Sequence, residues 1–198
     1  PLYYSEIVRK IFAKTVNNDD LDSSDRYAIE TSSNLHKYTK RHLISAKQDE
    51  KHIYKLWHTP SQIVYSEVPH KYQDGWKVFI SLTNQFSSFV DNCGMTQSIA
   101  FIRCGSKEEA EKISKDLDAP IYKFINNLAR YGNFNNERIL QRLPKLDKIS
   151  LTDEEYYKSK KGDKNGKSSE APSKYAERFL NKDFIEKYNK KPIGCTQK

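Results

Sequence analysis

The stretch Cys93-Gly-Met-Thr-Gln-Ser-Ile-Ala-Phe-Ile-Arg103, followed closely by Ser106-Lys-Glu-Glu109, marks the point where the chain changes its type of secondary structure. The turn signal around Gly94 leads into an apolar run that is typical of a buried strand. Ser106 and Glu109 have the spacing of a capping box, in which two side chains accept hydrogen bonds from free backbone N–H groups at the start of a helix. The stretch therefore predicts a strand ending at Arg103 and a helix beginning after Ser106.

Before this point the chain consists of short β-branched and aromatic segments, separated by turn signals such as Gln73-Asp74-Gly75. The predicted strands are residues 27–31, 52–57, 62–66, 76–82, 86–90 and 96–103. Strands joined by short turns favour antiparallel pairing. We therefore expect a mainly antiparallel central sheet over residues 26–103.

Beyond Gly105 the spacing of apolar residues becomes helical. Three helices are predicted: one after the capping box through Leu117, one that Pro120 opens and Gly132 closes, and a short one that Asn135 can cap and Pro144 ends. Strands followed by helices favour the α+β class over alternating α/β. We expect an α+β domain in which the helices of residues 106–143 pack on the sheet.

The two ends of the chain differ from this central part. Residues 5–14 have the apolar spacing of a helix that docks on a larger body, and residues 17–25 are polar and turn-forming. A further capping box, Thr152 with Glu155, precedes a basic stretch that is nearly free of apolar aliphatic residues. The predicted division is a helix and linker from another domain (1–25), a central domain (26–157), a basic flexible loop (158–173), and an appended C-terminal helix with its tail (174–198).

Composition favours a polyanionic partner. The 198 residues include 34 Lys and Arg against 26 Asp and Glu, a formal net charge of +8, and each phosphate that such a surface neutralises releases a condensed counterion. No apolar run approaches the roughly 20 residues of a membrane span, and no signal-peptide pattern opens the sequence. We expect a cytoplasmic protein without a membrane partner, and Pro1 in place of an initiator Met suggests a fragment of a longer chain.

Cysteine and histidine spacing does not predict a metal site. Cys93, Cys104 and Cys195 form no C-x-x-C pair, and the five histidines lack the spacing of zinc ligands. Without an export signal the thiols are expected to be reduced. A structural role is therefore the preferred interpretation of Cys93 and Cys104.

Basic residues are concentrated between His36 and Lys55, with Tyr38 and Tyr54 among them. Such a stretch can follow a phosphate backbone while its aromatic rings stack or wedge. The alternative is a solvated charged face with no partner. The predicted phosphate contacts are Lys37, Lys40, Arg41 and Lys51.

A second candidate region is the segment of residues 124–144, in which amide, aromatic and guanidinium side chains are crowded. Asn and Gln can pair bidentately with adenine and Arg with guanine, so these residue types suit contacts with base edges. The alternative is a polar connection between helices, because Asn tolerates turns. The predicted base contacts are Thr96, Gln97, Asn126, Arg130, Asn133, Asn135 and Arg138.

The chain contains no recognisable catalytic motif, so whether it is itself an enzyme stays open. Asp49-Glu50-Lys51 has the form of half a nuclease motif, for which Asp74 or Glu67 can supply a second carboxylate to hold Mg²⁺. Two alternatives to DNA recognition therefore stand: a Mg²⁺-dependent DNA endonuclease domain, and a basic protein-interaction module.

Several short segments together resemble the C-terminal target-recognition region, or TaqI-like specificity domain, of bacterial type II N6-adenine DNA methyltransferases and fused restriction-modification enzymes. The similar segments are Ser5-Glu-Ile-Val-Arg-Lys-Ile11, Gly75-Trp-Lys-Val-Phe-Ile80, Gly94-Met-Thr-Gln-Ser-Ile-Ala100, Ile121-Tyr-Lys-Phe124, Leu143-Pro-Lys-Leu-Asp147 and Leu151-Thr-Asp-Glu-Glu155. The resemblance covers most of residues 5–155. The basic insert of residues 158–173 departs from the family pattern.

The resemblance implies a division of labour. The family's S-adenosylmethionine pocket and its Asn/Asp-Pro-Pro-Tyr/Phe loop are absent from this sequence, so the chain is expected to need no cofactor and to methylate nothing by itself. A catalytic domain in the same parent chain would bind S-adenosylmethionine, flip the adenine out of double-stranded DNA and methylate N6. The present chain is then expected to hold the DNA and select the sequence.

Overall fold

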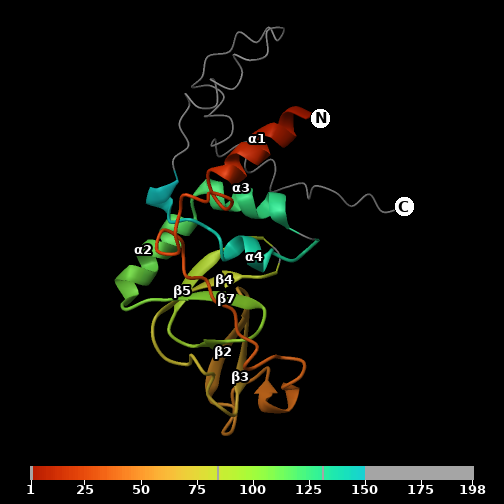
Figure 1. The fold of residues 1–198 in the computed structure, drawn as a ribbon. Helices are drawn as coiled ribbons and strands as arrows, with labels where there is room; N and C mark the ends of the chain where they lie inside the picture. Colours follow the sequence, from red (N-terminus) through yellow and green to blue (C-terminus); the bar gives the residue numbers. More distant parts are fainter. Residues whose placement is uncertain (1, 84, 131, 150–198) are drawn as a thin grey trace, which may run out of the picture.

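The computed structural model describes residues 2–83, 85–130 and 132–149 (Figure 1). Helices gather at one end of the molecule and a long β-hairpin forms the other end. The helices are α1 (Leu2–Ala13), α2 (Lys107–Leu117), α3 (Pro120–Ala129) and α4 (Glu137–Leu140), with 3₁₀ turns η1 (Arg41–Leu43) and η2 (Leu146–Lys148). The strands are β1 (Ile44–Ser45), β2 (Tyr54–Thr59), β3 (Gln62–Ser66), β4 (Lys77–Ser81), β5 (Ser88–Asp91), β6 (Gly94–Met95) and β7 (Ile99–Arg103).

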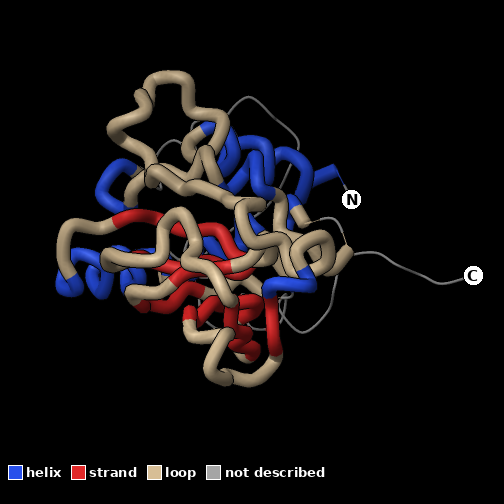
Figure 2. Tube along the Cα trace, turned by 90° about the horizontal axis from the view of Figure 1, so that it is seen from below, coloured by secondary structure: helices blue, strands red, loops and turns tan. Residues whose placement is uncertain are grey.

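The mixed α and β content and the antiparallel pairing confirm the coarse fold prediction, but the expected single central sheet is wrong. The described strands form a four-stranded sheet in the order β1-β3-β2-β6 and a three-stranded sheet in the order β5-β4-β7. All pairings are antiparallel except that of β2 with β6. Seen from below in Figure 2, the strands lie near the middle of the molecule and loops cover much of the visible surface.

The chain passes from one sheet to the other at the start of the segment predicted as the strand 96–103. Gly94 and Met95 pair with β2, whereas the residues from Ile99 onward pair with β4. Between them, the backbone N–H of Thr96 donates to the carbonyl oxygen of Trp57 (2.9 Å). The chain therefore leaves the first sheet at Thr96 and enters the second at Ile99, and the predicted strand 96–103 is three residues shorter at its start.

The prediction of a strand over residues 27–31 is also wrong, because this segment forms isolated bridges and no regular strand. The segment makes two isolated bridges, one between Arg26 and Pro144 and one between Glu30 and Phe101. The Glu30 backbone pairs with Phe101 through two hydrogen bonds of 2.8 and 2.9 Å. These contacts place the segment beside β7 and join the start of the domain to the end of its helical part.

Three apolar clusters stabilise the fold, since burial of apolar surface is the main favourable contribution to folding. The largest joins the three-stranded sheet to α2, α3 and α4, and the OH of its buried Tyr122 donates to the carbonyl oxygen of Pro144 (2.8 Å). A second cluster, built on Phe79, Met95, Ile99 and Phe101, lies where the two sheets meet. A third cluster fills the hairpin between β2 and β3.

The starts of α2, α3 and α4 can be compared with the N-terminal caps predicted from the sequence. Ser106 Oγ accepts from Glu109 N (3.2 Å), and Glu109 Oε2 accepts from Gly105 N (2.7 Å), so the capping box is confirmed with the neighbouring glycine as the second donor. Pro120 begins α3 as predicted. The predicted cap at Asn135 is wrong, because α4 begins at Glu137 and the carboxamide of Asn135 is buried in other contacts.

The amphipathic helix predicted for residues 5–14 corresponds to α1, which begins earlier, at Leu2. Three predictions lie outside the described residues: the capping box at Thr152, the flexible segment of residues 158–173, and the C-terminal helix with its tail (174–198). Within the described part of the chain, no helix has both the length and the apolar character needed to cross a membrane.

Candidate nucleic-acid interface

Residues 36–43, called the basic loop below, lead into β1 and contain η1. His36 closes the first turn of this loop: its ring Nδ1 accepts a hydrogen bond from Tyr38 N (3.3 Å), and its carbonyl oxygen accepts from Lys40 N (2.8 Å). The turn leaves the side chain of Tyr38 68% exposed. Lys40 and Arg41 are exposed beside it.

The basic loop is attached to the hairpin at its start. Leu35, 3% exposed, belongs to the apolar cluster of the hairpin. The backbone N–H of Lys37 donates to Oε1 of Gln97 (2.9 Å), and Lys37 Nζ donates to Gln62 Oε1 at 3.4 Å. Gln97, which was predicted to contact bases, is half-buried and supports the basic loop through its Oε1.

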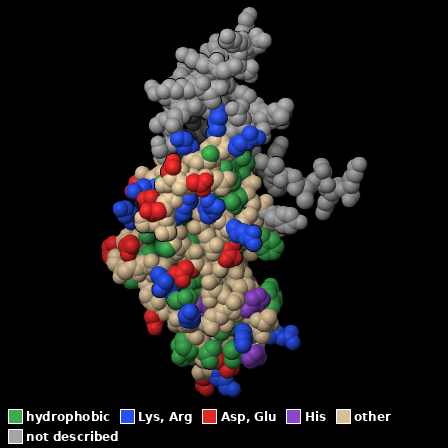
Figure 3. Space-filling model, viewed as in Figure 1, with side chains coloured by type: hydrophobic (Ala, Val, Ile, Leu, Met, Phe, Trp, Pro, Cys, Tyr) green, Lys and Arg blue, Asp and Glu red, His purple; other side chains and the backbone are tan. Residues whose placement is uncertain are grey.

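None of the predicted phosphate contacts, Lys37, Lys40, Arg41 and Lys51, forms an ion pair with a described residue. Figure 3 shows histidine, lysine and arginine side chains close together at the lower right, the part of the molecule where the basic loop lies. Cations on a protruding loop produce a positive potential that attracts polyanions.

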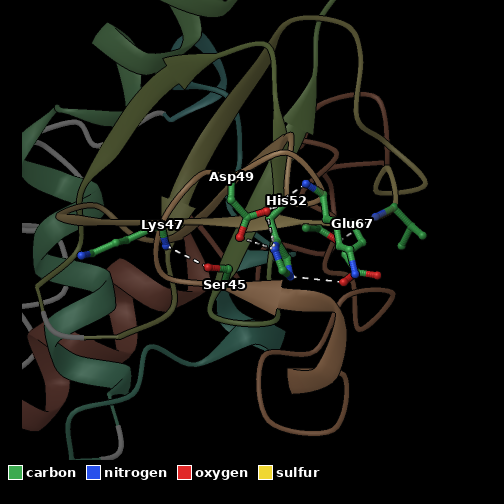
Figure 4. Close-up of polar contacts among 8 residues, drawn as sticks. Ser45, Lys47, Asp49, His52 and Glu67 are labelled. Carbon is green, nitrogen blue, oxygen red and sulfur yellow. Dashed lines mark hydrogen bonds and ion pairs between the residues drawn. The ribbon is translucent and has the colours of Figure 1, made fainter.

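Lys51 lies outside the basic loop, in the connection between β1 and β2. This connection is closed by Asp49, whose carboxylate accepts from Lys51 N (2.9 Å) and His52 N (2.8 Å) and lies 2.9 Å from His52 Nδ1 (Figure 4). The other ring nitrogen of His52 lies 3.5 Å from Glu67. Lys51 is thereby presented on an ordered turn next to the hairpin.

The hydrogen bonds around Asp49 also bear on the nuclease hypothesis. The backbone N–H of His52, the His52 ring and the backbone N–H of Lys51 together lower the pKa of Asp49 to about 2. The carboxylate is thus engaged in closing a turn. Across residues 2–83, 85–130 and 132–149, no group of three or more His, Cys, Asp and Glu side chains is placed to hold a metal ion. This arrangement does not favour the Mg²⁺ site predicted around Asp49-Glu50-Lys51.

Three of the predicted base contacts are buried, and their assignment is corrected. Thr96 is fully buried and its Oγ1 forms a 2.7 Å hydrogen bond with Nδ1 of His58. Asn126 and Asn135 are 1% and 6% exposed; Asn126 Nδ2 donates to Asn135 Oδ1 (2.9 Å), and Asn135 Nδ2 donates to the carbonyl oxygen of Ser81 (2.7 Å). Buried polar groups need such partners. All three side chains hydrogen-bond within the fold, and their burial does not favour the predicted base contacts.

The remaining predicted base contacts lie around the connection between α3 and α4. Asn133 and Arg138 are exposed, and Arg130 is half-buried. Phe134 was not among the predicted base contacts; it lies between Asn133 and Arg138 in the chain and is 63% exposed. Its position in the run Asn133-Phe-Asn-Asn136 could have indicated its exposure, because a ring flanked by amides is not typical of a core segment.

The predicted residues therefore form two separate patches. The basic loop and the β1–β2 connection, which contains Lys51, lie near the hairpin, whereas the α3–α4 connection and α4 lie at the helical end (Figure 1). Figure 1 shows the basic loop and the α3–α4 connection both projecting to the right of the molecule, one below the other.

A partly buried polar cluster between the two sheets was not predicted. Asp91 accepts hydrogen bonds from Lys55 Nζ (2.6 Å) and Trp57 Nε1 (2.8 Å), and thus links β5 to β2. Burial opposes the charge of Asp91, but these hydrogen bonds outweigh burial and lower its pKa. Lys77, 1% exposed, donates through Nζ to the carbonyl oxygens of Asp74 (2.8 Å) and Gly75 (2.6 Å). The cluster has the features of a structural link between sheets.

Two titratable groups beside this cluster are held neutral. Burial raises the pKa of the Cys93 thiol to about 12 and lowers the pKa of His70 to about 4. Tyr72 N donates to Nδ1 of His70 (3.0 Å), so the neutral ring carries its proton on Nε2, which lies 2.9 Å from Ser32 Oγ. A thiol that is not ionised is a poor nucleophile. The structural interpretation of Cys93 agrees with this environment.

Comparison with known proteins adds no assignment. No family model matches the sequence, and no curated protein or solved structure is significantly similar to the chain.

Proposed function

We propose that this chain is the sequence-specific DNA target-recognition domain of a type II restriction-modification N6-adenine DNA methyltransferase. The observation that supports this proposal best is the basic loop, which protrudes from the hairpin with cations around an exposed Tyr38. Phosphate contacts position a protein on DNA, and an aromatic ring among them can stack or wedge. Lys37, Lys40, Arg41 and Lys51 are the proposed phosphate contacts.

The second patch supports the sequence-specific part of the proposal. Asn133 and Arg138 are exposed and carry side chains that can form bidentate hydrogen bonds with adenine and guanine. Asn133 belongs to a connection that the buried Asn135 holds to β4, and Arg138 lies on α4, which follows it directly. Base contacts need such support, because their geometry must be fixed before DNA binds.

The methyltransferase part of the proposal depends on the resemblance of residues 5–155 to the family. Under this proposal, a catalytic domain in the same cytoplasmic parent chain binds S-adenosylmethionine and transfers the methyl group, while the present chain contacts double-stranded DNA. Thr96, which belongs to a segment similar to the family, is buried at the junction of the two sheets. In this chain Thr96 therefore has a structural role at the junction, and its burial does not favour a base contact.

The experiment is fluorescence anisotropy with a pool of short duplexes of randomised sequence, over a range of salt concentrations. The full chain is compared with a Lys40→Ala/Arg41→Ala variant and a control, Lys112→Ala, in which an exposed lysine of α2 is removed. Each lost phosphate contact lowers the slope of log K against log salt by about 0.9, so the double variant should lose about two units of slope. The control should bind like the unsubstituted chain.

Two outcomes would contradict the proposal. The first is the absence of duplex binding at low salt, which would favour the basic protein-interaction module. The second is an equal loss of binding in the control variant, which would mean that the positive charge acts without a defined surface. Calorimetry with S-adenosylmethionine adds a separate check, because cofactor binding by this chain alone would contradict the assignment of catalysis to another domain.

A further inference from the structure

Phe134 combines high exposure with a well-supported backbone. Its side chain is 63% exposed, while the backbone of Phe134 forms an isolated bridge with Thr83. The next residue, Asn135, donates from its backbone N–H to the carbonyl oxygen of Leu82 (3.0 Å) and from its buried carboxamide to Ser81 O (2.7 Å). The ring is therefore presented to solvent by a segment attached to the end of β4.

The surroundings of Phe134 are polar. Asn133 and Asn136 flank it in the chain and are exposed, and Arg138 is exposed on α4. The acidic residue of this stretch, Glu137, is engaged: its Oε1 accepts from Thr31 Oγ1 (2.7 Å) and lies 3.3 Å from Gln141 Nε2.

These surroundings indicate which kind of partner covers the ring. Aromatic rings and arginine are also enriched at protein interfaces, so the flanking carboxamides of Asn133 and Asn136 favour DNA here. A nucleobase presents a flat π face together with hydrogen-bonding edges, and carboxamides can pair with those edges. An aromatic ring between amides and a guanidinium group matches both features of a base.

We propose that Phe134 stacks on a nucleobase of the bound DNA, with Asn133 and Arg138 contacting base edges or phosphates beside it. This inference rests on the proposed function. Stacking on an aromatic side chain is tolerant of sequence, because every base has a π face. Phe134 thus supplies affinity and fixes the position of one base, and its amide and guanidinium neighbours supply discrimination.

The inference is tested with three substitutions in the full chain: Phe134→Ala, Phe134→Leu and Phe134→Trp. Base–aromatic stacking is worth about 1–3 kcal/mol, so the alanine and leucine variants should bind the duplex pool about 5- to 150-fold more weakly. Tryptophan should retain the affinity, since it preserves the stacking face. The control is Val68→Ala, which removes another exposed apolar side chain, 40% exposed, at a distance along the chain.

A spectroscopic measurement separates stacking from an indirect structural effect. 2-Aminopurine is placed at successive positions of a duplex that the unsubstituted chain has selected from the pool. Its fluorescence should change on binding at one position, and this change should be lost with Phe134→Leu and kept with Phe134→Trp.

The outcomes distinguish this inference from the proposed function. Absence of any duplex binding by the unsubstituted chain would overturn both. Normal duplex binding with unchanged affinity and unchanged 2-aminopurine fluorescence in Phe134→Ala would overturn the stacking role alone. Equal weakening by Leu and Trp, or by the Val68 control, would also overturn it.

Discussion

Replacement of Asn135 by alanine should destabilise the protein far more than replacement of its exposed neighbour Asn133. The carboxamide of Asn135 joins two parts of the chain that are distant in sequence: it accepts a hydrogen bond from Asn126 on α3 and donates one to the carbonyl oxygen of Ser81 at the end of β4. Alanine removes both hydrogen bonds and leaves both partners in place.

The magnitude follows from the burial of those partners. Asn126 and Ser81 are each 1% exposed, so water does not readily replace the lost carboxamide. A buried polar group left without a partner costs about 1–3 kcal/mol, and two such groups give an expected loss of about 2–6 kcal/mol. A natural domain has a total stability of about 5–15 kcal/mol, so this is a large fraction of it.

Urea denaturation of the full chain, followed by tryptophan fluorescence, measures the difference in the free energy of unfolding. Asn133→Ala is the matched control, since an exposed substitution changes this free energy by about 0.5 kcal/mol or less. The double variant Asn126→Ala/Asn135→Ala should lose less than the sum of the single variants, because the two side chains share one hydrogen bond. Equal losses for Asn133→Ala and Asn135→Ala, or additive losses in the double variant, would refute the structural role assigned to Asn135.

Three further predictions concern the region where the two sheets meet. Gly94→Ala should lower stability by about 1–3 kcal/mol through overpacking, because an added Cβ would lie 2.5 Å from a methyl group of Leu56 and 2.7 Å from His70 Cβ. Thermal denaturation measures this loss. The control is Gly105→Ala, where the nearest atom to an added Cβ is 3.4 Å away. The pKa of His70 is lowered by burial to about 4, so the unfolded state binds a proton first as the pH falls. Stability should therefore decrease between about pH 6.5 and 4, by up to about 3 kcal/mol, and a His70→Asn variant that retains this pH dependence in denaturation curves would contradict the assignment. Cys93, whose pKa is raised to about 12 by burial, should react with iodoacetamide at mildly alkaline pH only after denaturation; modification of Cys93 in the native chain, detected by peptide mass spectrometry, would count against its burial.

Local sequence patterns predicted the elements whose stability depends on neighbours along the chain. The strand predicted for residues 62–66 is β3, and the start of α2 at the Ser106 capping box and of α3 at Pro120 are as expected. A cap, a turn or an alternating strand involves residues only a few positions apart, so its physical cause is visible in the sequence. The α+β class followed from the order of these elements.

The pairing of the strands was decided by long-range packing. The apolar run after Gly94 suits either sheet, and the buried contacts of Thr96 with Trp57 and His58 divide it between the two. Those partners lie 38 or more residues away in sequence, as the Thr96–His58 contact shows. A β pattern specifies that a segment pairs, but not with which strand.

The candidate site shows the same limit. The sequence shows where amides, cations and aromatic rings are concentrated, because these groups are properties of the residue types themselves. It does not indicate which of them face solvent: Asn135 is buried and Asn133 is exposed, although they are two positions apart in one polar loop. Burial depends on where that loop meets β4, so only the tertiary structure separates the amides that stabilise the fold from Asn133, Phe134 and Arg138, which remain available to a partner.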